Sequence, residues 1–399
     1  MNENKLINNF KKSYNTNNFN IIKKAWDFAE KAHQGQKRTS GENYFTHPIA
    51  VANILYELNL DANTIITGLL HDVVEDCDIT IDILETEFGK EVATLVNGVT
   101  KLSKIELQSD RSKQAENFRK LFLATSNDIR VLLVKLADRT HNMRTIGGIK
   151  IVEKRQRIAQ ETLEIFAPLS ERVGLISLKN EMEDLAFAVV QPQMRTSIIN
   201  RLSFLENESK KLIPQIIEEI RITLAKGGIN VIEISGRLKT AFSIWQKMQR
   251  RNVPMDQLSD IMAFRILVES TQNCYLSLGL IHSKYPNVIG RFKDYISTKK
   301  RNGYQSLHTD VIGPFKQKIE IQIKTFEMHK IAETGIAAHW LYKQNVEKIK
   351  KINNSWVQDL VSILDQDHGP EDFLENTKLE MYADQVFCFT PKGDLIALP

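Results

Sequence analysis

The stretch from Leu70 to Asp76 combines two metal-competent side chains with two further carboxylates. At 3.6 residues per turn, His71 and Glu75 are expected one turn apart on the same face of a helix. Asp72 and Asp76 share that spacing, and the apolar run before them predicts that the helix is buried. Burying four such groups is costly and the carboxylates repel each other, but a divalent cation would remove that cost. The alternative interpretation is a solvated helix end.

Two residues from other predicted helices could complete a metal site. His47 opens one helix and Asp138 lies toward the end of another, so a helical bundle could bring both to the His-Asp pair. Two imidazoles and two carboxylates suit Mn²⁺ or Fe²⁺ and are less typical of structural zinc. Water on such an ion has a lowered pKa and supplies hydroxide near neutral pH. The two carboxylates one turn further on need not be ligands, since they could position or deprotonate the attacking water. Lone histidines such as His33 and His141 are more often packed or surface residues.

A second group of charged residues lies in the other half of the chain. Its basic members follow a predicted strand and are Arg237, Lys239, Lys247, Arg250 and Arg251. Alone, they would be explained as a solvated helix face. Asp260, however, starts an apolar strand, and alternation in the segment 319–324 puts Glu320, Gln322 and Lys324 opposite three core isoleucines. Two carboxylates facing a basic surface suit Mg²⁺-assisted phosphoryl transfer, which needs metal ligands and cations around the spreading charge.

The first site requires a helical scaffold, and the sequence up to about residue 224 predicts helices only. Apolar periodicity indicates helices at 20–33, 48–55, 60–74, 79–88, 92–102 and 128–144. Residues 103–117 are charged and lack periodicity, which indicates a loop. The Asn- and Lys-rich residues 1–19 indicate a frayed end.

The second site requires strands, and after Gly227 and Gly228 the pattern changes to β-branched, partly alternating segments. Strands are predicted at 229–234, 261–268, 307–312 and 318–323, with helices at 242–250, 271–285 and 326–342. The fold expected is therefore an all-α domain, a helical connector, and an α+β domain with a mixed sheet. A polar tether follows, and the last stretch, 384–394, indicates a strand and turn.

Composition indicates a multidomain protein of the cytoplasm. A chain of 399 residues is long for one domain, while 42% apolar and 26% charged residues are ordinary for a globular protein. The net charge of +4 is too small to indicate nucleic-acid binding. Cys77, Cys274 and Cys388 lie far apart without a CxxC pattern, which fits a reducing compartment. No apolar run reaches the ~20 residues of a membrane span and the start lacks a signal-peptide core, so a cytoplasmic location is expected.

Four runs in the first half resemble the hydrolase domain of the long RelA/SpoT family, whose members make and degrade the alarmones ppGpp and pppGpp. They are KAHQGQKRTSGENYFTHP, GLLHDVVED, VTKL and KLADRTHNMRT. The resemblance implies an HD-type domain in which Mn²⁺ is held by His47, His71, Asp72 and Asp138. It further implies that the nucleophilic water is served by Glu75 and Asp76. The implied lining of the guanosine and phosphate pocket is Arg38, Ser40, Tyr44, Asn142 and Thr145. Thr39, often Lys or Ser in relatives, departs from the pattern where packing on the base is expected.

In the second half, residues 291–296 and 302–309 resemble the synthetase signature of the same family, and the implied fold is nucleotidyltransferase-like. The resemblance implies catalytic and Mg²⁺-binding roles for Asp260 and Glu320, with Glu320 alternatively accepting the proton of the acceptor 3′-hydroxyl. Tyr304 would stack on the guanine of GDP or GTP. The other implied contacts to the nucleotides are Arg237, Lys239, Lys247, Arg291, Lys293, Lys300, Gln305, His308 and Gln322. The basic form of residues 291–294 is typical of bifunctional members.

The resemblance spans roughly residues 20–345 and gives the expected domain boundaries. These are a flexible N-terminus at 1–19, the hydrolase domain at 20–157, a helical connector at 158–226, the synthetase domain at 227–345, a linker at 346–383 and the start of a TGS domain at 384–399. The expected partners are GDP, GTP, (p)ppGpp and ATP, with no membrane and no nucleic acid bound by this half. Ribosome contact is expected only through the regulatory half of full-length members.

Three interpretations of function remain at this point. The first is a bifunctional enzyme of the stringent response that makes and hydrolyses (p)ppGpp. The second is a hydrolase with a weak or inactive synthetase, because Leu238, Thr240 and Lys324 depart from the family pattern. Lys at position 324 keeps the charge of the usual Arg but loses its bidentate geometry. The third, a nucleotide-sensing module that only binds, is disfavoured by the intact metal ligands and carboxylates.

Overall fold

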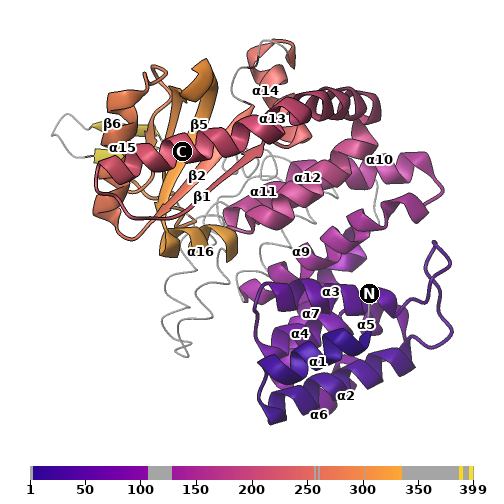
Figure 1. Ribbon diagram of the computed structural model, residues 1–399. Coiled ribbons are helices and arrows are strands. Elements are labelled where there is room, and N and C mark those ends of the chain that lie inside the picture. Colours follow the sequence, from indigo (N-terminus) through magenta and orange to yellow (C-terminus); the bar gives the residue numbers. More distant parts are fainter. Residues whose placement is uncertain are drawn as a thin grey trace. The chain divides into compact units, whose positions relative to one another are not determined.

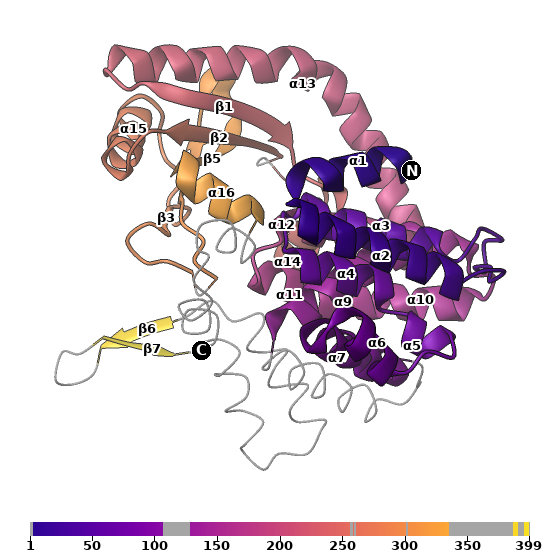
Figure 2. The same cartoon turned by 90° about the horizontal axis from the view of Figure 1, so that it is seen from below.

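The computed structural model describes residues 3–106, 128–255, 258, 261–300, 302–334, 386–389 and 395–398. The chain divides into two compact units, with the boundary between Leu169 and Ser170 (Figures 1 and 2). Within these ranges, no helix is both long enough and apolar enough to cross a membrane. Asp260, the linker at 346–383, residues 335–342 of a predicted helix and most of the predicted loop at 103–117 lie outside the described residues.

The first unit has a core of packed helices, as its periodicity predicted. The helices are α1 (Glu3–Ser13), α2 (Thr16–Ala32), α3 (Thr46–Glu57), α4 (Ala62–Leu70), α5 (Val73–Asp76), α6 (Ile81–Phe88), α7 (Lys90–Glu106), α9 (Ile129–Arg144), the 3-10 turn η1 (Ile146–Gly148), α10 (Val152–Glu161) and the π-helix η2 (Thr162–Phe166). Helix α4 is apolar on nearly every face and packs against α2, α3, α7 and α9 (Figure 2). Asp61 caps its first turn through the Thr64 amide, and Asp128 caps α9 in the same way. The two central helices therefore have fixed starting points, and the site residues lie just after the end of α4 and in the C-terminal half of α9.

The start of the chain does not form the frayed end that its composition indicated. Residues Glu3–Ser13 form α1, and Leu6 and Phe10 on its inner face are buried. The Phe10 ring meets the ring of Tyr56 edge to face, with centroids 5.3 Å apart. Two apolar residues spaced one turn apart are enough to attach this polar helix to the domain, and composition alone conceals that spacing.

A second correction concerns the helix predicted at 60–74, which is interrupted at His71 and Asp72. Helix α4 ends at Leu70, and the one-turn helix α5 starts at Val73. The His71 imidazole donates from Nδ1 to the Gly68 carbonyl at 2.9 Å, the group that would accept the Asp72 amide in a continuous helix. The side chains of the HDVVED run are therefore directed by a turn and not by helical spacing alone.

The second unit begins with the helices of the predicted connector and continues as an α+β fold. The helices are α11 (Ala167–Arg172), which spans the unit boundary, α12 (Ile176–Val190), α13 (Pro192–Lys226), α14 (Ala241–Arg251), α15 (Thr271–Lys284), the 3-10 turn η4 (Pro314–Lys316) and α16 (Phe326–Thr334). The strands are β1 (Val231–Leu238), β2 (Met262–Val268), β3 (Lys293–Asp294), β4 (Leu307–Ile312) and β5 (Lys318–Thr325). Their order is β1-β2-β5-β4-β3, with β2 and β5 parallel and the other pairs antiparallel, so the expected mixed sheet is confirmed.

The sheet has one apolar and one polar face. Ile319, Ile321 and Ile323 of β5 are fully buried and share a core with residues of α13 and α15 (Figure 1). On the opposite face, the register places Glu320 between Ala263 of β2 and Asp310 of β4. The polar row that the alternation predicted is thus flanked by further polar residues of β4.

The last described element is a two-stranded hairpin formed by β6 (Val386–Phe389) and β7 (Leu395–Leu398). The strands are antiparallel, with Val386 opposite Leu398. Strand β6 agrees with the strand expected there, and the expected turn lies outside the described residues.

Candidate metal centre and nucleotide site

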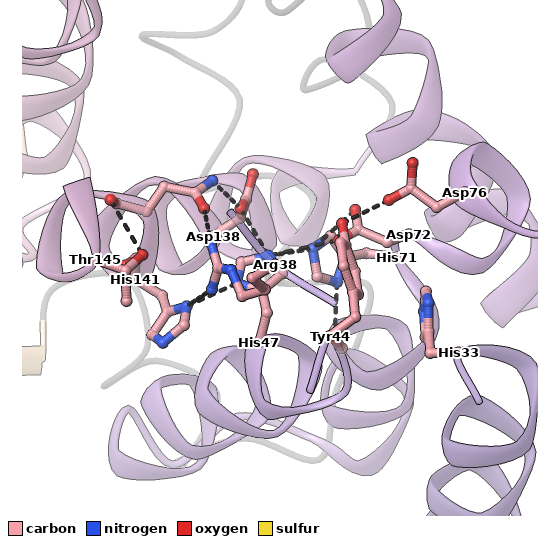
Figure 3. Close-up of polar contacts among 12 residues, drawn as sticks. His33, Arg38, Tyr44, His47, His71, Asp72, Asp76, Asp138, His141 and Thr145 are labelled. Carbon is pink, nitrogen blue, oxygen red and sulfur yellow. Dashed lines mark hydrogen bonds and ion pairs between the residues drawn. The ribbon is translucent and has the colours of Figure 1, made fainter. Parts of the chain in front are cut away.

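The four predicted ligands of the first site converge on one point (Figure 3). The Nε2 atoms of His47 and His71 lie 3.2 Å apart. The Asp138 Oδ1 lies 3.2 Å from the His47 Nε2, and the Asp72 Oδ1 lies 3.1 Å from the His71 Nε2. All four residues are buried. His47, His71 and Asp138 form a group with ligand atoms spaced closely enough to hold one metal ion.

Hydrogen bonds around the imidazoles decide which ring nitrogens carry protons. Arg38 can only donate, so the His141 Nδ1 that it contacts at 3.0 Å is unprotonated. The His47 Nδ1 lies 2.7 Å from that atom and is therefore the protonated nitrogen of its ring. His71 likewise donates from Nδ1 to the Gly68 carbonyl. The Nε2 lone pairs of His47 and His71 consequently face each other, an arrangement that is repulsive alone and favourable around a cation.

Burial keeps His47 and His141 neutral, and a neighbouring cation keeps Asp138 ionised. Burial lowers the pKa of His47, and burial together with His47 and Arg38 lowers the pKa of His141 to about 3. Burial raises the pKa of Asp138, but the ammonium of Lys135, 2.8 Å from Oδ2, lowers it well below its usual range. Neutral imidazoles and ionised carboxylates are the forms in which these groups bind metals.

Tyr44 links the metal cluster to the water-handling carboxylates predicted beside it. Its hydroxyl lies 2.9 Å from the Asp72 Oδ2 and 2.5 Å from the Asp76 Oδ2. Burial and the two carboxylates raise the pKa of Tyr44, so the phenol stays protonated. The amides of Glu75 and Asp76 both bond to the Asp72 carbonyl, which fixes the α5 turn next to the ligands.

The other residues implied for the hydrolase pocket lie at different distances from the cluster. Asn142 donates to the Asp138 Oδ1 at 2.6 Å and accepts from Arg38 at 3.0 Å, so both belong to the site network. Thr145 bonds to the His141 carbonyl at the end of α9. Ser40 is exposed and donates to Glu42, and no described contact joins it to the metal ligands.

In the second unit, Glu320 is the centre of a polar cluster on the open face of the sheet. Its Oε2 lies 2.5 Å from the Lys239 Nζ, and its Oε1 accepts from the Gln322 amide at 3.1 Å. Burial raises the pKa of Glu320, but Lys239 outweighs this and lowers it to about 2. Glu320 is therefore ionised, which is the form in which a carboxylate binds a metal ion. Its present partner is the ammonium of Lys239.

Tyr304 lies within a second cluster next to that carboxylate. Its hydroxyl is 2.7 Å from the His308 Nε2 and accepts from the Lys324 Nζ at 3.2 Å. The Lys324 ammonium also lies 4.9 Å from the centre of the Tyr304 ring, a cation–π distance. Burial and the nearby Arg265 lower the pKa of Lys324 to about 8, and burial lowers the pKa of His308 to about 4.

The loop before Tyr304 is held by its own backbone and by one side chain. Gly303 has a φ of 77°, a left-handed conformation suited to the turn predicted there. The Asn302 side chain accepts from the Tyr304 amide at 3.1 Å and donates to the Glu171 carbonyl at 2.9 Å. The ammonium of Lys300 lies 5.0 Å from the centre of the Tyr295 ring.

The remaining predicted nucleotide contacts are less closely tied to the cluster. Lys293 lies in β3 with its ammonium 6.0 Å from the centre of the Tyr295 ring. Arg237 in β1 and Arg291 in the loop before β3 are exposed, whereas Lys247 in α14 and Gln305 are half-buried. Asp260 lies outside the described residues, so its role as a magnesium ligand stays a prediction.

Comparison with known proteins identifies both halves. Residues 25–176 match the model described as "HD domain", and residues 236–347 match the "Region found in RelA / SpoT proteins". The chain belongs to the RelA/SpoT family.

Its curated relatives in the family match almost the whole chain. A GTP pyrophosphokinase of Myxococcus xanthus is 49% identical over 384 residues, covering 95% of this chain and 50% of that protein. The bifunctional (p)ppGpp synthase/hydrolase SpoT of Escherichia coli is 43% identical over 381 residues, covering 95% of this chain and 54% of that protein. A guanosine-3′,5′-bis(diphosphate) 3′-pyrophosphohydrolase of Vibrio cholerae is also 43% identical, with the same coverage. The chain thus spans about half the length of these relatives.

Four residues of the RelA/SpoT sites were not found from the sequence. Lys135 and His141 lie on α9 with Asp138, three residues before and three after it, so helical spacing could have drawn attention to both. His141 had been interpreted as a packed or surface residue, but the structure places it against His47 and Arg38. Asp310 lies two residues after His308 and directly opposite Glu320, a position that only strand register could indicate. The fourth, Gln36, lies in a polar loop and carries no periodic signal.

Proposed function

We propose that this chain both hydrolyses and makes (p)ppGpp, at two separate sites. Hydrolysis at a Mn²⁺ site in the first unit would yield GDP or GTP plus pyrophosphate. Synthesis at a Mg²⁺ site in the second unit would transfer pyrophosphate from ATP to the 3′-hydroxyl of GDP or GTP. The observation that carries the proposal is the convergence of two imidazole lone pairs and two buried carboxylates in the first unit. The relatives are named for both reactions.

For hydrolysis, the residues of the first unit supply the ligands, the base and the substrate contacts. A bound Mn²⁺ would lower the pKa of its water and offset phosphate charge. Glu75 and Asp76 would position that water and accept its proton, next to the ligand Asp72. Attack on the phosphorus joined to the 3′ oxygen breaks that P–O bond and releases pyrophosphate. Arg38, at the edge of the cluster, offers a guanidinium for the anionic substrate.

For synthesis, the polar face of the sheet would bind both nucleotides. Glu320 would hold Mg²⁺ or accept the proton of the attacking 3′-hydroxyl, and Lys239 lies beside it to neutralise the phosphates of ATP. Tyr304 would stack on guanine from a ring position fixed by His308 and Lys324. The hydroxyl attacks the β-phosphorus of ATP, and AMP leaves.

One observation keeps a second function open, namely a hydrolase with a weak synthetase. Lys324 is only 3% exposed, and burial lowers its pKa to about 8. An ammonium with that pKa is partly deprotonated near neutral pH, whereas the Arg expected at this position would stay charged. The two functions differ only in whether the second unit makes ppGpp.

Two assays of the purified chain test the proposal. Wild-type protein should release pyrophosphate from ppGpp with Mn²⁺ and should form ppGpp from ATP and GDP with Mg²⁺. His71→Ala or Asp72→Ala should abolish the first reaction and leave the second measurable, because the two sites lie in separate units. Asp78→Ala is the matched control, since Asp78 is exposed and follows the α5 turn. Hydrolysis that persists in either ligand variant, or in excess chelator, would exclude the metal assignment.

The proposal extends to the partners and the location of the protein. The substrates would be guanine nucleotides and ATP, and ribosome contact would belong to regions beyond the span matched here. The three dispersed cysteines support a reducing cytoplasmic location.

A further inference from the structure

A hydrogen-bonded pair, His33 and Gln36, contacts the α5 turn. Gln36 donates from Nε2 to the Asp76 carbonyl at 2.8 Å. Its Oε1 lies 2.9 Å from the His33 Nδ1. Both residues belong to the loop after α2, whereas Asp76 ends α5. The pair therefore connects two segments that are forty residues apart in sequence.

The direction of each hydrogen bond in this chain is fixed by chemistry. The Asp76 carbonyl can only accept, so the amide nitrogen of Gln36 must face it. The amide oxygen of Gln36 then faces His33, whose Nδ1 must carry the proton. The result is a directed chain of donors from His33 through Gln36 to Asp76. Reversing the amide would break both bonds, and reversing the tautomer would break the bond between His33 and Gln36.

The side-chain carboxylate of Asp76 is contacted by Tyr44, which also packs against His33. The Tyr44 hydroxyl contacts the Asp76 carboxylate, and the Tyr44 ring stacks on the His33 ring with centroids 4.8 Å apart at 21° (Figure 3). The backbone adds to this support, since the Tyr44 amide bonds to the Gln36 carbonyl at 3.0 Å. Main chain and side chain of Asp76 are thus fixed by one small assembly.

The burial of His33 indicates that this assembly has a function beyond packing. His33 is completely buried, and its Nε2 has no hydrogen-bond partner among the described residues. A buried, unpartnered ring nitrogen opposes folding, so an apolar ring would suit packing better. What an apolar ring could not supply is the Nδ1 proton that orients Gln36.

We propose that His33 and Gln36 are positioning residues of the hydrolase, which set where the Asp76 carboxylate meets the attacking water. The inference rests on the hydrolysis proposed above. It assigns no contact with metal or substrate to either residue. Their effect is expected on turnover and not on Mn²⁺ or ppGpp binding.

The test compares kinetics and metal binding in Gln36→Met and His33→Phe. Each keeps side-chain bulk, and each removes one link of the donor chain. We expect kcat for ppGpp hydrolysis to fall ~10–100-fold in each, the usual effect of losing such a supporting contact. KM and the Mn²⁺ affinity measured by titration calorimetry should stay near wild type. Both residues act through the same hydrogen-bond chain. The kcat of the double variant should therefore be no lower than that of the slower single variant.

The matched control is Gln34→Met, since Gln34 is exposed in the same loop two residues earlier. It should match wild type in every measurement. Wild-type kcat in Gln36→Met would overturn the inference. So would a loss that appears equally in Mn²⁺ affinity, because the pair would then act on the ligands.

A measurement independent of activity separates this inference from the proposed function. Hydrogen exchange at the amides of residues 75–77 should be faster in Gln36→Met than in wild type, with other helices unchanged. Unchanged exchange would overturn the positioning role even if hydrolysis is observed. A wild-type protein without hydrolysis would instead overturn the proposed function.

Discussion

Lys324 should make the rate of the proposed synthesis depend on pH, and a single substitution should remove that dependence. Its ammonium donates to the Tyr304 hydroxyl at 3.2 Å and to the Gln322 amide oxygen at 3.4 Å, so the charged form holds the ring proposed to stack on guanine. Burial disfavours the charged form and lowers the pKa from 10.5 to about 8. The charge is therefore present below pH 8 and is lost as the pH rises through that value.

The size of the effect follows from the fraction of protonated Lys324. With a pKa of about 8, roughly 90% of the side chain is charged at pH 7 and roughly 10% at pH 9. If synthesis requires the ammonium, its rate should fall about tenfold between these values. The two titratable rings beside Lys324 do not account for this change, because the pKa of His308 is about 4 and burial raises the pKa of Tyr304.

The assay is the initial rate of ppGpp formation from ATP and GDP with Mg²⁺ between pH 6.5 and 9.5. Lys324→Arg should give a nearly flat profile across this range, because an Arg side chain stays protonated in proteins. Lys324→Met should be slow at every pH, since it imitates the neutral lysine. The reasoning is refuted if Lys324→Arg shows the same alkaline decline as wild type, or if wild type shows none.

Three further predictions concern single side chains. Glu75→Gln should bind Mn²⁺ and ppGpp but hydrolyse ~10²–10⁴-fold more slowly, as for a lost general base, and a loss of metal would make Glu75 a ligand instead. Lys135→Met leaves the buried Asp138 without its ion-pair partner and should cost about 3–5 kcal/mol of stability in chelator, measured by denaturant unfolding. Added Mn²⁺ should restore part of the lost stability. An equal loss of stability with and without Mn²⁺ would contradict the role of Asp138 as a metal ligand. Tyr304→Ala should weaken GDP binding in calorimetry at least tenfold while ATP binding is kept, whereas equal weakening of both would contradict stacking on guanine.

Local patterns in the sequence were sufficient for the elements and for the residues with the strongest chemistry. The strand at 307–312 was predicted with the bounds that the structure gives it, and alternation at 319–324 correctly separated the buried isoleucines from Glu320. The adjacent His71 and Asp72 were interpreted as a metal pair, and the structure places both beside His47, while the metal itself stays a prediction. These inferences succeed because period and burial are properties of a single segment.

What required the tertiary structure was every relation between segments. Periodicity predicted one helix through Asp72, but the imidazole of His71 competes for a helical carbonyl and interrupts it. The contact of Arg38 with His141, which fixes the His47 tautomer, joins side chains 103 residues apart. Such contacts leave no periodic trace in either segment, because each depends on how the helices pack.

The sequence by itself therefore determined most of the helices and strands, though not α1, the break at His71 or β3. It also determined the two candidate sites and the likeness to one family. Only the tertiary structure decided that Arg38 contacts His141, that Asp310 lies opposite Glu320, and that Gln36 holds the Asp76 turn. The physical reason is that ionisation and hydrogen-bond direction depend on the distances between groups. Those distances are set by packing and by strand register, which a linear pattern does not contain.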